Sequence, residues 1–264
     1  MIYRPDSSVL HCFVTEISKP SVGKLQELYS KYLYHDLPTR FFGITVFYNY
    51  ITEISKPSVG KFQELYSKYL NHDLPTRFFG FTHQYLQMNA ILPRLDTLSI
   101  VGFPCNQFGH QEPADNSTEL YNGLRYVRPG SQYVPSFRMM KKIDVNGKKE
   151  APLYTFLKKS CQPPSMASFN KFEVFSDPIM PYDITWNFEK FLIDDSGHPV
   201  YRFLPPVEPN DLVDLIREMA SGSATAAQLE QQLLKIDKIN KARAAKVEKE
   251  EKEDIEEEKK ENSA

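Results

Sequence analysis

The sequence predicts a mixed α/β sandwich. Helical and strand-like patterns alternate from about residue 85 to residue 220, and the series closes with two strand-like stretches joined by a tight turn. The chain has 264 residues, of which 41% are apolar, and it contains 18 Phe and 15 Tyr. This is enough apolar material for one sizeable core, so a disordered chain and a collagen-like fibre are both excluded.

The first predicted elements are a helix, a strand and a second helix. Residues 85–95 have helical spacing, and 98–103 form a short apolar run that ends at Pro104, as a buried strand ends in a loop. Asn116 followed by Glu119 is typical of a capping box ahead of a helix through Leu120, Leu124 and Val127.

The second half of this region continues the alternation. Asn146-Gly147 is a strong turn signal, and residues 151–161 have a helical pattern. A strand is predicted through 186–193, a turn at 194–197 and a returning strand through 198–204. A last amphipathic helix is predicted from Asn210 to Met219.

The N-terminal region contains a near-perfect duplication. Residues 15–43 and 52–80 are copies offset by 37 positions, and only two of the 29 positions differ. Because exposed and core positions are copied alike, a recent exon duplication or a gene-model artefact is favoured over a functional tandem module. Each copy has the pattern of one amphipathic helix and lacks strand-like alternation. Residues 1–79 are therefore predicted to be poorly integrated with the domain that follows.

The composition changes again at residue 221. In residues 241–264, 16 of 24 side chains are charged, while Leu229, Leu233 and Ile236 form a short apolar stripe. The stripe is too short for a coiled coil, which needs three or four heptads. Residues 221–264 are predicted to be a charged helical or disordered tail, with a protein-interaction arm as the alternative.

Charge and composition argue against several partner classes. The formal net charge is -2, so the chain has no strong positive electrostatic field that would indicate a nucleic-acid partner. No apolar run has the length of a membrane span or a signal peptide, so the sequence shows no targeting signal. It would be cytoplasmic if the N-terminus is right. Three cysteines do not make a disulfide framework, and the six histidines lack paired ligand spacing, so no metal is expected.

Two segments carry specific chemistry, namely Val101 to Pro113 (VGFPCNQFGHQEP) and Asp183 to Leu192 (DITWNFEKFL). Together with Leu124 to Gly130 (LRYVRPG) between them, they closely resemble the glutathione peroxidase family. The resemblance covers about residues 80–220 and implies a thioredoxin-like fold. The Arg128-Pro129-Gly130 loop and the long segment 161–182 resemble the tetrameric, plasma-type branch.

The resemblance implies three hydrogen-bond donors around a chalcogenolate nucleophile: Gln107, Trp186 and Asn187. Neutral N–H donors stabilise such an anion and can hydrogen-bond the leaving oxygen. In the family, selenocysteine or cysteine precedes a Gly-Leu-Thr-x-Gln-Tyr segment at the end of a buried strand. Here the matching segment is 80–85 (GFTHQY), preceded by Phe79, which cannot act as a nucleophile. The strand that should lead into it is expected to be absent, replaced by the second copy.

The implied activity is thiol-dependent reduction of hydrogen peroxide and organic hydroperoxides in the oxidative stress response. Its partners would be glutathione or another thiol and a hydroperoxide, in a homotetramer without metal or organic cofactor, and secretion is implied by the branch. Arg202 matches a position that often faces the site, where it could bind glutathione carboxylates, with an ordinary surface arginine as the alternative. Cys105 is interpreted as a buried thiol and Cys161 as a surface thiol. The alternative function is a non-catalytic relative with a binding or assembly role.

Overall fold

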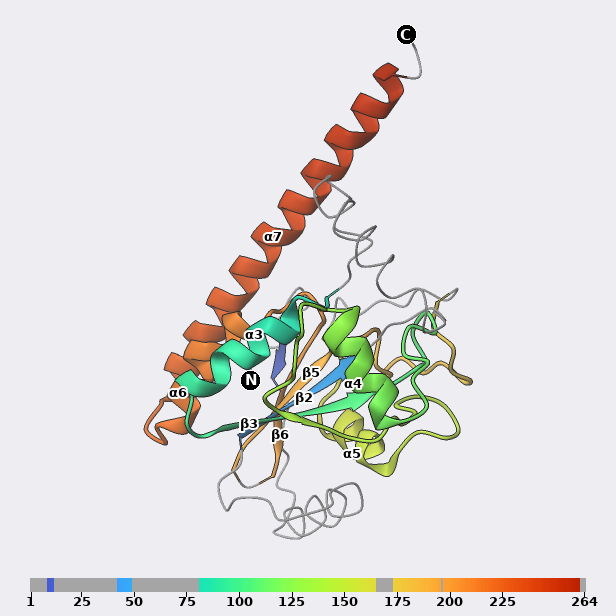
Figure 1. The fold of residues 1–264 in the computed structure, drawn as a ribbon. Helices are drawn as coiled ribbons and strands as arrows, with labels where there is room; N and C mark the ends of the chain where they lie inside the picture. Colours follow the sequence, from blue (N-terminus) through green and yellow to red (C-terminus); the bar gives the residue numbers. More distant parts are fainter. Residues whose placement is uncertain (1–8, 12–41, 49–80, 165–172, 196, 262–264) are drawn as a thin grey trace.

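The computed structural model describes residues 9–11, 42–48, 81–164, 173–195 and 197–261. These residues form one six-stranded sheet with helices on both faces, and a long helix leaves the body toward the C-terminus (Figure 1). The strands are β1 (Val9–His11), β2 (Phe42–Tyr48), β3 (Leu98–Pro104), β4 (Arg138–Met139), β5 (Lys190–Ile193) and β6 (Pro199–Phe203). The helices are α3 (Gln84–Ile91), η3 (Leu92–Arg94), α4 (Ser117–Tyr126), α5 (Pro152–Ser160), η4 (Pro209–Leu212), α6 (Val213–Ala220) and α7 (Ala226–Glu261).

The sheet has the order β1-β6-β5-β2-β3-β4. The central strand β2 pairs parallel with β3 and antiparallel with β5, and β5 and β6 form an antiparallel hairpin. A parallel β2–α3–β3 unit followed by an antiparallel β5–β6 hairpin is the connectivity of a thioredoxin-like fold. The α/β fold expected from the sequence is therefore confirmed.

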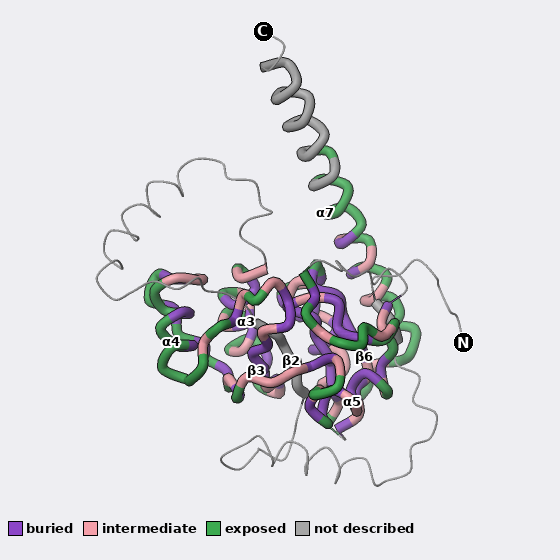
Figure 2. Tube along the Cα trace, turned by 90° about the vertical axis from the view of Figure 1, so that its right-hand side faces the viewer, coloured by how far each residue is buried: buried purple, intermediate pink, exposed green. Residues whose placement is uncertain are grey.

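Two apolar layers lie on opposite faces of the sheet. In β3, Ile100 packs with residues of α3, α4 and α6, whereas Val101 and Phe103 pack with residues of α5. In β5, Leu192 faces the first layer and Phe191 the second. This alternation follows from the two-residue period of a strand, and Figure 2 shows the buried residues gathered in the centre of the body.

The end of helix α3 and the start of helix α4 follow local sequence signals. Pro93 falls inside the predicted helix 85–95, where the α-helix gives way to the short 3₁₀ turn η3. At the start of α4, the Asn116 side chain accepts a hydrogen bond from the Glu119 N–H at 3.0 Å, and Glu119 accepts one from the Asp115 N–H. The predicted cap is confirmed.

The predicted strand through 186–193 is wrong over its first half, because β5 begins only at Lys190. Phe188 has a φ of 64°, which is incompatible with extended backbone. The Glu189 carboxylate also turns back to accept hydrogen bonds from the N–H and hydroxyl of Thr185. Residues 185–189 therefore form a compact loop before the strand.

The prediction that residues 1–79 are poorly integrated does not hold for two segments. β2 is the central strand of the sheet, and β1 pairs antiparallel with β6, with Leu10 opposite Arg202. The strand expected to be absent before the nucleophile position is thus present as Phe42–Tyr48. A continuous apolar run such as Phe41 to Phe47 is typical of a strand buried on both faces, so the sequence did carry this signal. The rest of the two copies lies outside the described residues.

The first part of α7 packs on the body rather than forming a separate tail. Ile236 is 1% exposed within the core layer of α6, and Arg243 makes ion pairs with Asp211 and Glu208. The apolar stripe predicted from the sequence is therefore a docking face for α6, and Arg243 extends the contact. Beyond the body, α7 continues as a helix to Glu261 (Figure 1).

Candidate active site at the carboxyl end of β2 and β3

The residues implied by the family motifs come together at one edge of the sheet. Because β2 and β3 are parallel, their carboxyl ends meet at this edge, and Gln107 lies three residues after β3. Strand β5 runs the opposite way and starts at Lys190 opposite Val46, so Trp186 and Asn187 lie beside the end of β2. The topology brings two segments that are about 80 positions apart in the sequence to one place.

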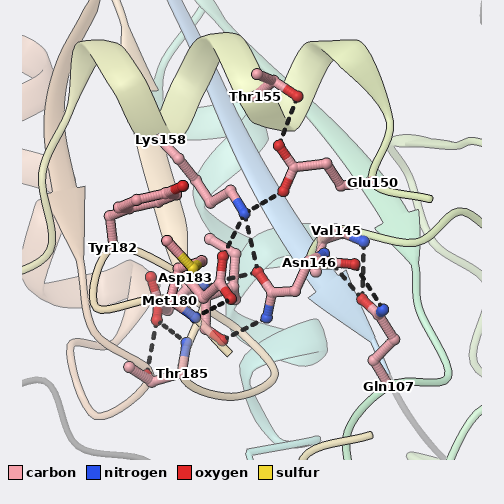
Figure 3. Close-up of polar contacts among 12 residues, drawn as sticks. Gln107, Val145, Asn146, Glu150, Thr155, Lys158, Met180, Tyr182, Asp183 and Thr185 are labelled. Atoms are coloured by element: carbon pink, nitrogen blue, oxygen red, sulfur yellow. Dashed lines mark hydrogen bonds and ion pairs between the residues drawn. The ribbon is translucent and has the colours of Figure 1, made fainter. Parts of the chain in front are cut away.

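Gln107 is held by the turn that follows β4. Its Oε1 accepts hydrogen bonds from the Val145 N–H at 2.9 Å and the Asn146 N–H at 3.0 Å, and its Nε2 donates to the Asn146 carbonyl at 2.9 Å (Figure 3). The side chain is 7% exposed. A carboxamide has two N–H donors, so one remains for another acceptor. Gln107 is a fixed group with little freedom left.

Trp186 lies against the same segment. Its ring packs on Phe108, the residue after Gln107, with 5.8 Å between ring centroids, and the side chain is half-buried against the apolar layer of α5. Trp186 is the chain's single tryptophan. The ring packing anchors the indole beside Gln107.

Asn187 is the most unusual polar group of the site. It is 2% exposed, and neither Nδ2 nor Oδ1 has a hydrogen-bond partner among the described residues. Burying an amide without partners costs free energy, about 1–3 kcal/mol per unsatisfied group. Within the part of the chain that the structure describes, such a group is free to hydrogen-bond a bound molecule.

The segment that follows the nucleophile position reaches the same loop. The ring of Phe81 lies 6.4 Å from that of Phe188, and the ring of Tyr85 lies 5.3 Å from it. Phe188 is the neighbour of Asn187, so the 81–85 segment packs directly beside the candidate donors. Phe79 itself lies outside the described residues.

Arg202 is neither a ligand-binding residue nor a surface arginine. It is fully buried, and its Nε donates to the Glu189 carboxylate at 2.7 Å. Its two Nη atoms donate to the carbonyl groups of Tyr182 and Asp183, at 3.0 and 2.8 Å, and of Cys161 at 3.4 Å. Arg202 therefore supports the 182–189 loop through these hydrogen bonds. Its guanidinium has no pair of N–H groups left to bind a substrate carboxylate.

The two cysteines of the described region are both unsuited to nucleophilic attack. Cys105 is a free, fully buried thiol, and burial raises its pKa to about 12. Cys161 is fully buried and disulfide-bonded, so its interpretation as a surface thiol is wrong. Of the chain's three cysteines, the third, Cys12, lies outside the described residues.

Residues that the sequence analysis did not single out hold this loop together. Asn146, read only as a turn residue, donates from Nδ2 to the Ile184 carbonyl at 2.8 Å and accepts from the Ile184 N–H at 2.9 Å. Lys158 on α5 contacts Asn146, Asp183 and Glu150. Their sequence signal is weak because single polar residues on an amphipathic helix or turn normally face solvent.

A second buried lysine, Lys190, also contacts the loop before β5. Lys190 is fully buried, and its Nζ donates to Gln84 Oε1 at 2.8 Å, to the Phe188 carbonyl, and to the Pro205 carbonyl at 3.4 Å. Burial lowers its pKa to about 7, and the neighbouring Glu189 carboxylate is the charge that most opposes this shift.

Within the described residues, no group of three or more His, Cys, Asp or Glu could hold a metal ion. No helix among those residues is long and apolar enough to cross a membrane.

Known proteins share sequence with part of this chain. A sequence model of the family described as glutathione peroxidase matches residues 47–158. The epididymal secretory glutathione peroxidase of Rattus norvegicus is 51% identical over 122 residues, which are 46% of this chain and 55% of the relative. Glutathione peroxidase 3 of the same species is 43% identical over 148 residues, which are 55% of this chain and 65% of the relative.

Two solved structures were also found. The apo form of Trgpx matches with a TM-score of 0.38 and 24% identity over 70% of this chain and 83% of that chain. T. cruzi GPX1 matches with a TM-score of 0.39 and 23% identity over 72% and 90%. The matched part of the chain spans 55% of the length of the first of these curated relatives and 65% of the second. Over the matched part, this chain is similar to glutathione peroxidases, among them the epididymal secretory enzyme and glutathione peroxidase 3.

Proposed function

We propose that this chain serves the reaction of its family, the thiol-dependent reduction of hydrogen peroxide and organic hydroperoxides as an antioxidant. The observation that carries the proposal is the buried, unpartnered amide of Asn187 at the sheet edge where Trp186 and Gln107 also lie. Three neutral donors converging on one edge suit a site that stabilises an anion without adding charge.

The proposed reaction has three steps. A thiolate or selenolate attacks the terminal oxygen of R–O–OH and the O–O bond breaks. The RO⁻ that leaves takes a proton to become R–OH, or water where R is hydrogen. A first glutathione converts the oxidised E–SOH to E–S–SG and releases water. A second glutathione releases GSSG and restores the thiol. The reaction consumes no metal or organic cofactor.

The donors act on the two charged atoms of the first step. Asn187 and the remaining N–H of Gln107 would hydrogen-bond the anionic chalcogen and thereby lower its pKa. The Trp186 N–H would donate to the oxygen on which charge develops. Only interactions that strengthen in the transition state accelerate the step, so these donors need a nucleophile to act on.

The nucleophile must come from the stretch between β2 and α3. In the family it precedes the segment that matches 80–85, at the end of a buried strand, and here β2 ends at Tyr48. Phe79 is 31 positions later in the sequence, because the second copy intervenes. The chain as given is thus expected to lack turnover. The alternative, a non-catalytic relative, rests on Phe79 alone.

A coupled assay of glutathione oxidation with hydrogen peroxide tests the proposal on three proteins. The chain as given is expected to show no turnover, and Phe79→Cys little, because the thiol would be far in sequence from its supporting strand. A variant in which one Cys replaces residues 51–79 places the thiol directly after β2 and is expected to be active. The same replacement with Ser is the matched control.

The outcomes separate the two readings. Activity of the Cys replacement that disappears when Asn187→Ala is added supports the peroxidase function. A folded Cys replacement without activity supports the non-catalytic relative. Activity in the chain as given would mean that another cysteine acts as the nucleophile.

The compartment and the assembly follow from the same proposal. Relatives named as secretory, together with the disulfide bond of Cys161, favour an oxidising compartment outside the cytosol. We expect the chain to form a homotetramer like the plasma-type branch that it resembles, with glutathione or another thiol as its reductant. Sedimentation velocity of the purified chain tests the assembly.

A further inference from the structure

The two halves of the candidate site come from separate segments that need a common support. Gln107 belongs to the segment after β3, whereas Trp186 and Asn187 belong to the loop before β5. Asn146 connects them, because its backbone binds the Gln107 amide and its side chain binds both the N–H and the carbonyl of Ile184. The relative position of the donors therefore depends on how firmly Asn146 is held.

Lys158 holds Asn146 from the α5 side. Its Nζ donates to Asn146 Oδ1 at 3.2 Å, to Asp183 Oδ1 at 2.6 Å and to Glu150 Oε2 (Figure 3). An ammonium group has three N–H donors, and all three are used. The side chains of Lys158 and Asp183 are each 1% exposed.

Each partner of Lys158 is itself fixed by a second contact. The other oxygen of Asp183 accepts a hydrogen bond from the Met180 N–H at 2.8 Å, and Glu150 Oε1 accepts one from the Thr155 hydroxyl at 2.6 Å. Asp183 is three residues before Trp186, at the start of the donor loop. The cluster thus ties the donor loop to α5 and to the turn that grips Gln107.

Stability alone is a poor explanation for this cluster. Taking a lysine and a carboxylate out of water costs about as much as their attraction returns, and apolar residues of similar volume often do as well. A buried ion pair does, however, permit few alternative geometries, which suits a site whose donors must be placed within about 0.5 Å.

We propose that Lys158 is a positioning residue that fixes the Trp186–Asn187 loop relative to Gln107. It contacts neither substrate nor nucleophile and acts through Asn146 and Asp183. The role in catalysis rests on the proposed function, but the effect on loop position does not. The two are measured separately.

Trp186 provides the direct readout because it is the single tryptophan of the chain and lies in the loop. Lys158→Met keeps most of the volume and removes the charge and all three donors. The variant is expected to remain folded, with a red-shifted Trp186 emission and a higher acrylamide quenching constant than the parent chain. Lys159→Met, the same substitution at the neighbouring lysine of α5, is the control, since the Lys159 side chain is exposed.

Two further variants keep the test decisive if Lys158→Met does not fold. Asp183→Asn weakens the same link and is expected to shift the Trp186 emission in the same direction, while Lys158→Arg restores charge and is expected to shift it less. Parent-like emission and quenching in the folded Lys158→Met variant overturn the proposal. If that variant is unfolded, parent-like spectra for Asp183→Asn and Lys158→Arg do so.

Activity is then measured in the Cys replacement of residues 51–79. There Lys158→Met is expected to lower kcat by about 100-fold, the cost of misplacing a site by roughly 1 Å, with little change in KM for glutathione. Lys159→Met is expected to leave kcat near the parent value. If the Cys replacement itself is inactive, the proposed function fails while the Trp186 spectra still decide the role of Lys158.

Discussion

Gln107 and Asn187 carry the same carboxamide group at nearly the same depth, 7% and 2% exposed, yet their surroundings are opposite. The oxygen of Gln107 accepts two backbone N–H groups and its nitrogen donates to a carbonyl, whereas Asn187 has no partner among the described residues. One amide is used to build the site, and the other makes no hydrogen bond to the described residues. The comparison shows that burial alone does not separate a structural amide from a functional one.

Among the changes measured at a single pH, the largest effect is expected from the residues that support the Asn187 loop. Arg202→Met removes the partner of the buried Glu189 and is expected to lower the free energy of unfolding by about 4 kcal/mol. Chemical denaturation measures the change. Lys235→Met, which breaks the exposed pair with Asp214, is the control and is expected to cost about 0.5 kcal/mol or less. Similar losses for both variants would contradict a supporting role for Arg202.

The next effect concerns Gln107, the side-chain amide that already has hydrogen-bond partners. Gln107→Ala leaves the buried N–H groups of Val145 and Asn146 without an acceptor and is expected to cost about 3 kcal/mol. The same denaturation experiment on Gln111→Ala, in the same segment, is the control. A Gln107→Ala chain as stable as the parent would show that the amide is not structural.

A pH-dependent effect comes from the Gln107 side of the site. Glu112 is 1% exposed, and burial raises its pKa to about 8 from 4.5. The folded chain then holds a proton that the unfolded chain loses, so stability from this group is full below pH 4.5 and is lost as pH rises to about 8. The slope is at most about 1.4 kcal/mol per pH unit.

Glu112→Gln removes this slope and is expected to gain stability over the parent as pH rises from 4.5 to 8. Denaturation at several pH values measures the difference in the free energy of unfolding between the two chains. Lys190 titrates in both chains, so its contribution cancels in this difference. A constant difference across this range would contradict the raised pKa of Glu112.

The smallest effect has the opposite sign. Asn187→Leu replaces an unsatisfied buried amide by an apolar side chain of similar size and is expected to raise the free energy of unfolding by about 1 kcal/mol. The same change is expected to abolish activity in the Cys replacement of residues 51–79. A loss of stability would mean that Asn187 has a structural partner and that the comparison with Gln107 fails.

Much of the fold between residues 85 and 220 could be predicted because its signals are local. The strand before Pro104, the Asn116 cap and the closing hairpin each depend on a few neighbouring residues, and the structure contains all three. Helix α7 shows the limit of such signals. Its apolar stripe was visible, but whether Ile236 meets solvent or α6 depends on a distant helix.

The candidate site divides in the same way. The motif residues Gln107, Trp186 and Asn187 could be named from the sequence, whereas their hydrogen-bond states could not. Arg202 shows why. Its ion pair joins residues 13 positions apart that meet only when β5 and β6 pair. The motif gave no register, so the guanidinium could be taken for a ligand-binding group.

By itself, the sequence determined the family motifs, the order of the elements after residue 85 and the residue types available for donating hydrogen bonds. The tertiary structure alone decided that Phe42–Tyr48 is the central strand and that Arg202, Lys158 and Lys190 are buried supports. It also decided that Asn187 has no hydrogen-bond partner among the described residues. The physical reason is that an apolar or polar pattern fixes which groups a segment offers, while burial and hydrogen bonding depend on which other segments meet them.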